Sequence, residues 1–506
     1  MSVLVVDVGT TGLRAAVVRD DATIAGFTYE PLPPSSPFAG LVEFDGVAMR
    51  DAVLRVANAA LTSAGPVRAV GITAQRASTI VWDSRTGTPV APGLGWQDLR
   101  TVGECIGLRA TKNLVFAPNQ TATKLAWLLN NVEAARSPHA RAGTVDTWVA
   151  AVLSNFAVHA TDSSHAGVTG LADHAALAKH EWSHDVLDAL GINPAILPRI
   201  VPTMGAVGEA SALPGAPTMF AIVGDQQASL VGQGGIVAGA AKATFGTGGM
   251  LDVYAGTATP RHLARTARGT FPIVVYSEGD TLHWGSEAIM LTAGSNVEWL
   301  VNDMGLIPDA KSSEAVATSV ASSDGVVYVP ALIGMGTPQW DYGARGTLLG
   351  LTRGTTAAHV VRAVLEGIAH RGADLLEASE ADTGLRGERL RIDGGMSRNS
   401  VFVQALADSI GRPVEVCRDT EATTLGAAFL AGVAAGVWSN LGEATSLVRP
   451  LRTVEPRDTV EPRHTVEPRH TVEPRDASPS TSARAQWHEA VRRAQGWIPE
   501  LSALDF

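Results

Sequence analysis

The chain contains the same short pattern twice, at its start and near its midpoint, and this repetition limits the folds open to it more than any other feature. Residues 3–18 run from an apolar, β-branched stretch through a polar turn of glycine and threonine into a second apolar stretch. Residues 243–254 repeat this order. Each copy predicts two strands joined by a glycine-rich turn. Because the copies lie about half a chain apart, we expect two related lobes with a cleft between them.

The rest of the chain alternates between apolar runs that end at Gly or Asp and segments with helical periodicity. Residues 357–377 and 400–410 keep helical spacing of their apolar positions. The candidate strands lie at 67–72, 220–223, 325–330 and 390–392. This alternation predicts an α/β architecture. We expect the lobes to be residues 1–236 and 237–506.

One segment differs from the α/β pattern. Residues 453–476 repeat the hexamer Thr-Val-Glu-Pro-Arg-(Asp/His) four times, and a Ser- and Pro-rich stretch follows. Prolines and alternating charges cannot supply a core, so we expect an extended, disordered insertion at 453–482. A last helix is expected from about 483 to 496. The repeat is either a neutral spacer or a regulatory tail.

Size, charge and cysteine content exclude several classes of protein. With 506 residues, 45% of them hydrophobic, the chain can bury more than one core. A net charge of −11 argues against nucleic acid as a partner, since such binding needs clustered Lys and Arg. The only cysteines, Cys105 and Cys417, fit a reducing, cytoplasmic location. No signal peptide or run long enough to span a membrane is evident, so we expect no membrane insertion.

Both glycine-rich turns have the composition of a phosphate-binding site. The turns at 9–12 and 246–249 offer backbone N–H groups, small residues that allow close approach, and threonine hydroxyls. Neither fits the P-loop pattern or the dinucleotide-binding pattern. A third element at 390–399 runs from a strand through a glycine pair into a helix. There Gly395 allows a flat ring to approach, and Asn399 either bonds a purine edge or caps the helix.

Two further strand ends place polar side chains where α/β proteins often carry their functional groups. The apolar strand at 220–223 ends at Gly224-Asp225-Gln226-Gln227. Asp225 is our candidate general base for a substrate hydroxyl, the alternative being an aspartate that closes a turn. Arg76 ends another strand, and Trp96 follows a Gly- and Pro-rich loop. Arg76 would donate to adjacent hydroxyls of a substrate, and Trp96 would cover its C–H face. The alternative is that Arg76 is an exposed surface arginine and that Trp96 belongs to the core.

Together these segments resemble the glycerol kinase branch of the FGGY carbohydrate kinases. The segments that carry the resemblance are 7–11, 71–76, 223–227, 241–248, 344–347, 350–356 and 393–395. The similarity covers nearly the whole chain apart from the hexamer repeat. It implies a two-lobed actin-like, ribonuclease H-like ATPase fold with a central cleft. It also implies transfer of the γ-phosphoryl group of ATP to a hydroxyl of a polyol or sugar, with Mg²⁺ and cleft closure, and a homodimer or larger homo-oligomer.

The resemblance assigns roles to individual residues. Asp225 matches the family's catalytic base, and Asp7 matches the acidic residue near the metal. The nucleotide-binding positions are Thr10, Thr11, Gly12 and Arg14 in the phosphate hairpin, Thr247 and Gly294 beyond it, and Gly395 and Asn399 at the adenosine. Phosphoryl transfer depends mainly on positioning and charge stabilisation, which suits a site of backbone turns.

The substrate pocket follows the family pattern only in part. The positions that match glycerol contacts are Arg76, Trp96, Asp225 and Gln226. Three others depart from it: Ala77 replaces a glutamate, Asn119 replaces a tyrosine and Met250 replaces a phenylalanine. Loss of the carboxylate removes a hydroxyl acceptor. We therefore expect a substrate longer than glycerol, with a true glycerol kinase as the alternative.

Two other classes share the actin-like fold. Chaperone ATPases carry an additional peptide-binding domain, whereas here only the repeat and a short helix follow the second lobe. A non-catalytic sugar sensor would not require Asp225 beside a complete nucleotide site. ATP consumption that is independent of any polyol would favour either class.

Overall fold

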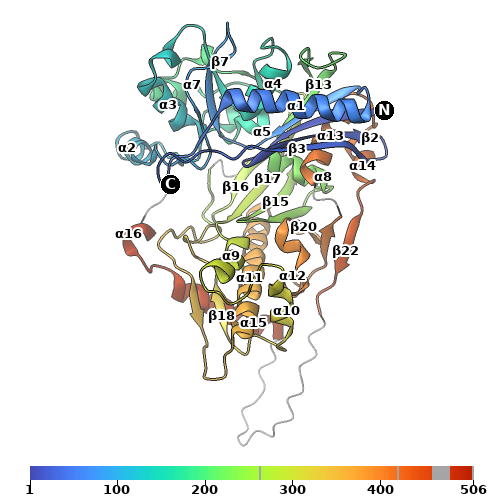
Figure 1. Ribbon diagram of the computed structural model, residues 1–506. Helices are drawn as coiled ribbons and strands as arrows, with labels where there is room; N and C mark the ends of the chain where they lie inside the picture. Colours follow the sequence, from blue (N-terminus) through green and yellow to red (C-terminus); the bar gives the residue numbers. More distant parts are fainter. Residues whose placement is uncertain (261–263, 419–420, 458–478, 504–506) are drawn as a thin grey trace, which may run out of the picture.

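The computed structural model describes residues 1–260, 264–418, 421–457 and 479–503, and shows two lobes, one above the other in Figure 1. A 13-stranded sheet runs through both lobes. From one edge to the other its strands are β22 (Pro450–Val454), β21 (Val414–Cys417), β20 (Leu390–Asp393), β14 (Ala241–Phe245), β15 (Gly249–Gly256), β17 (Thr281–Met290), β16 (Phe271–Glu278), β12 (Met204–Glu209), β13 (Thr218–Gly224), β5 (Ala69–Ala74), β1 (Ser2–Val8), β2 (Gly12–Arg19) and β3 (Ile24–Pro31).

The two halves of the sheet have the same strand order, as the sequence repeat predicts. In the first half, β3, β2 and β1 are antiparallel neighbours, and β5 and β13 continue parallel to β1. In the second half, β17, β15 and β14 are antiparallel, and β20 and β21 continue parallel to β14. The predicted turns at 9–12 and 246–249 join β1 to β2 and β14 to β15. The two-lobed α/β prediction is therefore confirmed.

Strand β1 is apolar from Val3 to Val6 because both of its faces are buried there. Its side chains alternate between the two faces of the sheet. Leu4 and Val6 join a core with helices α1 (Gly46–Ala64) and α4 (Val145–Leu153), whereas Val3 and Val5 join the core on the opposite face. Helices on both sides of parallel strands account for the continuous hydrophobic run.

The second lobe has its own core around a long central helix. Helix α11 (Ala357–Thr383) begins at a capping box formed by Thr356 and ends at Gly384, whose φ of 70° suits a residue without a side chain. It packs with α12 (Ser400–Ile410) against the strands of this lobe. The helices predicted at 357–377 and 400–410 are both present.

Helices from the two halves of the chain meet between the lobes. Helix α8 (Asp225–Gly232) and helix α13 (Ala422–Ala434) pack so closely that a Cβ atom at Gly232 or Gly426 would collide with the other helix's backbone. Helix α13 also packs on β1 and β5 in the core of the first lobe, where Figure 1 shows it in orange among blue strands. The boundary expected at 236/237 therefore does not separate the cores of the two lobes. Helix α13 comes after this boundary in the sequence but belongs to the core of the first lobe.

A smaller unit projects from the first lobe and has a separate core. Its sheet contains β4 (Glu43–Phe44), β8 (Gly93–Leu94), β6 (Thr79–Asp83), β7 (Thr88–Pro89) and β9 (Ala140–Thr144). Helices α2 (Val102–Lys112) and α3 (Thr121–Asn131) cover it. The loops of this unit carry Trp96 and Asn119.

The structure differs from the sequence expectation at both edges of the hexamer insertion. Residues 458–478 lie outside the described residues. Before them, β22 extends to Val454 and pairs with β21. After them, α15 (Pro479–Ala494) begins four residues earlier than the predicted 483–496 helix, and its Trp487 is fully buried on the second lobe. The first edge is ordered because it pairs with the sheet, and the second edge is the start of a helix that packs on this core through Trp487.

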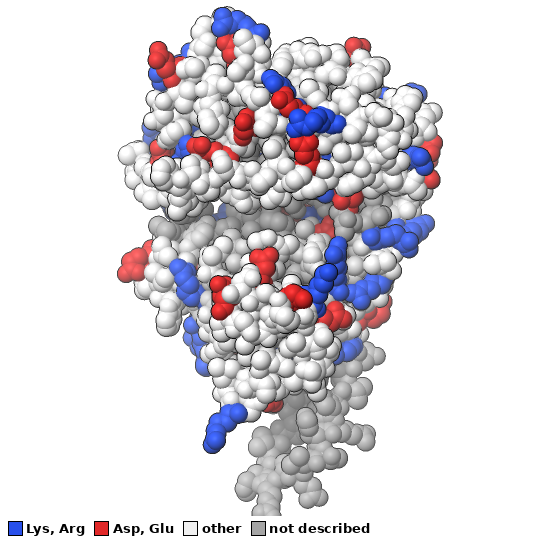
Figure 2. All heavy atoms as spheres, viewed as in Figure 1, with Lys and Arg blue, Asp and Glu red and all other residues white. Residues whose placement is uncertain are grey.

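Among the described residues, no helix combines the length and apolar composition that a bilayer span requires. Neither cysteine forms a disulfide among the described residues. The space-filling view shows the face of the molecule hollowed between the two lobes (Figure 2). The predicted site residues lie on strand ends and loops at this junction.

Candidate active site

Three parallel strands of the first lobe end at the same level. Val8, Ala74 and Gly224 are aligned across β1, β5 and β13. The segments that follow them therefore lie side by side: the 9–12 turn, Arg76 and Asp225. Carboxyl ends of parallel strands are the usual location of ligand sites in open α/β sheets. The register of three strands thus brings together candidates that lie more than 200 residues apart.

Asp225 is the first residue of α8 and remains accessible. Its side chain is 26% exposed, and its Oδ1 atom lies 3.6 Å from Nε of Arg76. The same oxygen accepts a hydrogen bond from the backbone N–H of Gln226 at 2.8 Å. A carboxylate at a helix N-terminus is stabilised by the helix dipole. The position suits a group that accepts a proton from a hydroxyl in the cleft.

Asp7 lies close enough to Asp225 for the two carboxylates to influence each other. Burial raises the pKa of Asp7 to about 7, Arg14 opposes this shift, and the charges of Asp225 and Glu421 add to it. Nε of Arg14 lies 3.2 Å from the Asp7 carboxylate, and its Nη1 lies 3.0 Å from Glu421. Arg14 therefore joins β2 to the residue that caps α13, and its guanidinium is held at the edge of the cleft.

A chain of hydrogen bonds connects the phosphate hairpin to the candidate substrate wall. Gln75 donates to the carbonyl of Gly9 at 3.3 Å and accepts from the Ser78 hydroxyl at 3.1 Å. The Ser78 hydroxyl in turn accepts from the backbone N–H of Trp96 at 2.9 Å. The indole Nε1 of Trp96 donates to the Thr10 hydroxyl at 3.1 Å, and the Trp96 side chain is exposed. The core-tryptophan alternative is therefore wrong, and the role of Trp96 as a wall of the substrate pocket stays a prediction.

A group of buried charged residues in the second lobe contacts the first-lobe candidates, and sequence reasoning missed it. Glu287 on β17 lies 2.6 Å from Nη2 of Arg76. Burial alone would lower the pKa of Arg76, but the carboxylates of Glu287 and Asp225 raise it. Arg76 is therefore not an exposed surface arginine. Its Nη1 has no hydrogen-bond partner among the described residues.

Lys242 on β14 is the other missed residue in this group. Its ammonium lies 3.0 Å from the carboxylate of Asp252 on β15 and donates to Oε1 of Gln226 at 2.7 Å. The one available signal was a lysine and an aspartate inside strands whose other residues are mainly apolar, because charged residues are seldom fully buried without a partner. The partners themselves depend on strand register and could not be assigned.

The second lobe brings its own strand ends together in the same way. Thr244 and Asp393 are aligned across β14 and β20. Gly394 has a φ of 86°, and a Cβ there would collide with the backbone of Phe245. A Cβ at Gly395 would instead meet no atom within 4 Å. Gly394 is thus needed for the turn, whereas Gly395 leaves an open surface on which a flat ring can lie.

The remaining nucleotide candidates of this lobe surround that surface. Gly294, at the start of α9 (Gly294–Asn302), donates its N–H to the carbonyl of Gly246 at 2.8 Å. Thr247 is exposed, and its carbonyl accepts from the Ser295 hydroxyl at 3.1 Å. Asn399 caps α12 by accepting from the Phe402 N–H, and its Nδ2 donates to Ser313. The structure therefore shows the capping role of Asn399, and its contact with a purine stays a prediction.

The phosphate hairpin contains one glycine that packing explains. A Cβ at Gly12 would lie 2.5 Å from the Tyr29 hydroxyl and 2.8 Å from the carbonyl of Glu30 on β3. A side chain at this position would therefore push β3 away, whatever the turn binds. Thr11 is exposed and Thr10 is half-buried beside Trp96. Phosphate contacts by Thr10, Thr11 and Gly12 stay predictions.

The three positions that depart from the family pattern have different surroundings. Ala77 is buried with a left-handed φ of 62°. Met250 is half-buried on β15, and Asn119 is exposed in the loop before α3. The buried Lys124 donates to the carbonyls of Asn119 at 2.8 Å and of Trp96 at 3.3 Å. This amine therefore holds the Asn119 loop beside the Trp96 wall.

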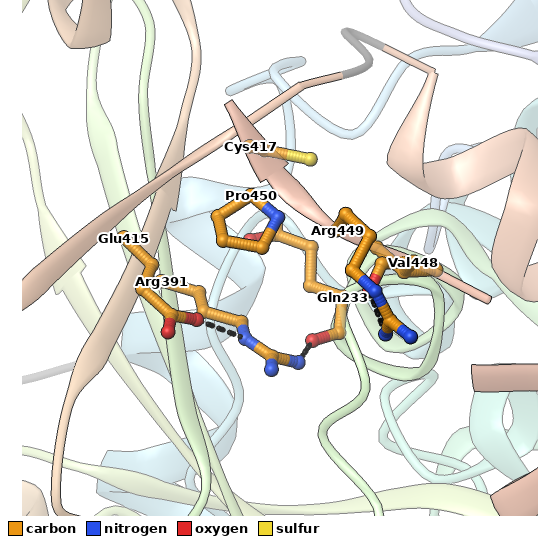
Figure 3. A pocket seen from close by; sticks show the side chains of 7 residues that line it. All are labelled: Gln233, Arg391, Glu415, Cys417, Val448, Arg449 and Pro450. Atoms are coloured by element: carbon orange, nitrogen blue, oxygen red, sulfur yellow. Dashed lines mark hydrogen bonds and ion pairs between the residues drawn. The ribbon is translucent and has the colours of Figure 1, made fainter. Parts of the chain in front are cut away.

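A separate small cavity lies beside the sheet edge formed by β20, β21 and β22 (Figure 3). An ion pair between Arg391 and Glu415 forms part of its lining, and Cys417 and Pro450 form another part. Its volume of about 10 Å³ is about that of one water molecule. It is too small for a metabolite, so the cleft remains the candidate site.

The duplicated sheet, with a glycine-rich turn in each half and the accessible carboxylate of Asp225 at a strand end, is that of the two-lobed actin-like fold, and the family comparison gives the class: phosphotransferases that act on an alcohol group. The N-terminal domain of the FGGY family of carbohydrate kinases matches residues 2–232, and the C-terminal domain of that family matches residues 241–435. The chain belongs to the FGGY family of carbohydrate kinases, and its relatives place it in the glycerol kinase-like branch.

Individual relatives extend over nearly the whole chain. The glycerol kinase of Trichlorobacter lovleyi is 37% identical over 514 residues, which cover 98% of this chain and 99% of that protein. The glycerol kinase of Bordetella parapertussis is 39% identical, with 98% and 97% covered. Among solved structures, Plasmodium falciparum glycerol kinase with ADP superimposes with a TM-score of 0.87 at 26% identity, covering 97% of this chain and 98% of that one. The chaperone and sensor alternatives are therefore set aside.

Proposed function

We propose that the chain transfers the γ-phosphoryl group of ATP to a hydroxyl of a short polyol, with glycerol as the first candidate acceptor. One observation carries the proposal: the accessible carboxylate of Asp225 stands at a strand end beside Arg76 and close to the phosphate hairpin. The names of the relatives support glycerol, since bacterial proteins that are similar over nearly the full length are named glycerol kinases.

In the proposed mechanism Asp225 accepts the proton of the attacking hydroxyl. The buried Nη1 of Arg76 has no hydrogen-bond partner in the described part of the chain, which supports a role as donor to a neighbouring hydroxyl oxygen. Trp96 covers the C–H face of the polyol. The turns at 9–12 and 246–249 would hold the phosphates through backbone N–H groups, so that the γ-phosphoryl group and the hydroxyl face each other across the cleft.

We assign Mg²⁺ binding to Asp7, assisted by Asp225. Carboxylate oxygens are the ligands that Mg²⁺ takes, and the buried Asp7 is held at the cleft by Arg14. Burial and the charges of Asp225 and Glu421 raise the pKa of Asp7 despite the neighbouring Arg14, and a divalent cation would add positive charge that favours the ionised carboxylate. When bound, the ion would neutralise charge on the β- and γ-phosphates.

A longer polyol or a sugar is the second candidate acceptor, and the departures from the family pattern favour it. Ala77 offers no carboxylate to bind a hydroxyl next to Arg76, and Asn119 is exposed at the edge of the cleft. A smaller residue at each place would leave room for additional carbons. Met250 is the third difference, on a strand that also carries the buried Asp252.

A phosphorylation screen tests the proposal. Purified protein with ATP and Mg²⁺ is offered glycerol, tetritols, pentitols and ketoses, and the polyol phosphate and ADP are measured together. We expect equal amounts of both products with at least one acceptor. Glycerol with by far the highest kcat/KM would identify a glycerol kinase and contradict the enlarged pocket. ADP release that no acceptor stimulates would contradict the proposed function.

We also propose a cytoplasmic location and a homodimeric or larger assembly, both on the basis of the family resemblance. Light scattering during size-exclusion chromatography measures the assembly. A monomer at micromolar concentration would contradict it.

A further inference from the structure

The residues Lys242, Asp252 and Glu287 form a ladder across three neighbouring strands of the second lobe. Lys242 on β14 is paired directly with Asp252 on β15, and Asp252 is paired with Glu287 on β17. Directly opposed residues lie on the same face of a sheet. At its two ends the ladder contacts substrate-site candidates of the first lobe: Lys242 contacts Gln226, and Glu287 contacts Arg76.

The ammonium of Lys242 has a complete set of partners. It carries three N–H groups and no acceptor. Its three contacts are the Asp252 carboxylate at 3.0 Å, the Gln226 amide oxygen at 2.7 Å and the Thr244 hydroxyl at 3.2 Å. The side chain is only 1% exposed, so water does not compete for these bonds. Lys242 is therefore fixed by its surroundings and has no free donor for a ligand.

This arrangement determines which end of the Gln226 amide faces the cleft. An amide has an oxygen that accepts and an NH₂ group that donates. Because Lys242 can only donate, it must face the amide oxygen, and the NH₂ group then points away from Lys242. Gln226 is half-buried and directly follows Asp225. With the oxygen engaged, the group left for a substrate is the N–H donor.

We infer that Lys242 is a positioning residue that makes Gln226 a hydrogen-bond donor to one non-reacting hydroxyl of the substrate. Gln226 would select for an oxygen that accepts at that position, because a deoxy carbon leaves the buried N–H unpaired. Asp252 holds Lys242 in place and neutralises it, and Glu287 does the same for Arg76. The inference rests on the proposed function, because it assumes that Gln226 contacts the polyol.

A double-mutant cycle tests the coupling between the two side chains. Gln226→Met and Lys242→Met are made singly and together, and the KM of the best neutral polyol from the acceptor screen is measured. We expect each single variant to raise this KM about tenfold, the size of one lost hydrogen bond, and the double variant to match Gln226→Met. The KM for ATP should stay within about twofold in all three.

A set of deoxy analogues, each lacking one hydroxyl of that polyol, adds a readout that a purely structural role would not change. Removing the hydroxyl that Gln226 binds should lower kcat/KM of the unaltered protein about tenfold. Removing the same hydroxyl should not lower kcat/KM of Gln226→Met any further. We expect Lys242→Met to lose discrimination at that same hydroxyl and to keep it at the others.

Lys242→Met leaves the buried Asp252 without its counter-ion and can fail to fold. The variant Lys242→Met/Asp252→Asn removes both charges, and the same results are expected of it. Effects that add to those of Gln226→Met, or that weaken all analogues equally, would overturn the inference and leave the proposed function intact. An unaltered protein that phosphorylates no polyol would overturn both.

Discussion

The proposed nucleotide side of the cleft is built mainly from backbone turns, whereas the proposed polyol side is built from polar and charged side chains of distant segments. Gly246 and Gly395 stand near strand ends and offer N–H groups and open surface. On the other side, Arg76, Gln226 and Asp225 are held by residues of the opposite lobe and by one another. A site made of backbone groups depends on glycine at a few positions, so it tolerates substitution of the surrounding side chains. A site made of side chains depends on which charges are paired, so such substitutions can change its substrate preference.

The largest expected effect breaks the chemistry and leaves the nucleotide side intact. Asp225→Asn should lower kcat by about 10² to 10⁴, the usual contribution of a general base. Nucleotide affinity, measured by isothermal titration with an ATP analogue, should stay within about threefold. Asp280→Asn is the matched control, since the Asp280 side chain is 98% exposed, and it should change neither value. Turnover of Asp225→Asn within tenfold of the unaltered protein would contradict the assignment.

A methyl group at Gly395 tests whether the open surface on the nucleotide side is used. Because a Cβ there would meet no protein atom, Gly395→Ala should leave the melting temperature unchanged. It should raise the KM for ATP about 100-fold, since each tenfold corresponds to about 1.4 kcal/mol of lost contact. Gly107→Ala on α2 has equally open surroundings and serves as the control. An unchanged KM for ATP in Gly395→Ala would place the adenosine elsewhere.

A carboxylate at position 77 tests whether the polyol side has been retuned. Ala77→Glu should raise the ratio of kcat/KM for glycerol to that for a pentitol about tenfold, because a charged acceptor adds a strong hydrogen bond to a short polyol and occupies the space of a longer one. The left-handed backbone at Ala77 already strains any residue with a Cβ, so the change adds no new backbone strain, and the melting temperature of the variant measures the cost of the buried carboxylate. Ala77→Gln is the matched control for size. An equal loss with all acceptors would mean that position 77 does not contact them.

The smallest effect concerns the amine that holds the Asn119 loop. Burial lowers the pKa of Lys124 from 10.5 to about 7 in the folded protein. Between these values the unfolded chain binds more protons at this position than the folded chain, so its contribution makes the free energy of unfolding rise with pH. Lys124→Met should flatten that rise between about pH 7 and 10.5, as measured by urea unfolding. Lys179→Met, at an exposed lysine, should leave the rise unchanged. A rise that persists in Lys124→Met would show that Lys124 titrates normally.

The sequence predicted those parts of the fold and site that depend on local pattern. The two hairpins were evident because an apolar run must stop where a turn of Gly and Thr begins, and the strands β1 and β14 do stop there. Asp225 and Arg76 were found because each follows an apolar strand. The end of a strand can be recognised from the local sequence, and neighbouring parallel strands of one sheet end at the same edge.

The parts that the sequence did not predict depend on contacts between distant segments. Lys242, Asp252 and Glu287 meet only through the register of three strands. The packing of α13 on the first lobe likewise depends on Gly71, where a Cβ would meet the carbonyl of Ala427 at 2.8 Å. At Gly12 and Asn399, ligand binding favours the same residue types as packing and helix capping, so the sequence alone did not separate these roles. Such ambiguities are resolved only by the neighbours that the fold supplies.

The central prediction is that Asp225 contacts the acceptor hydroxyl while that hydroxyl faces the nucleotide turns. A crystal structure with a non-hydrolysable ATP analogue, Mg²⁺ and the best polyol of the screen measures this directly. We predict one hydroxyl oxygen within about 2.6–3.2 Å of the Asp225 carboxylate and directed at the γ-phosphoryl group, with the phosphates at the turns 9–12 and 246–249. A polyol bound away from Asp225, or phosphates held outside both turns, would contradict the account.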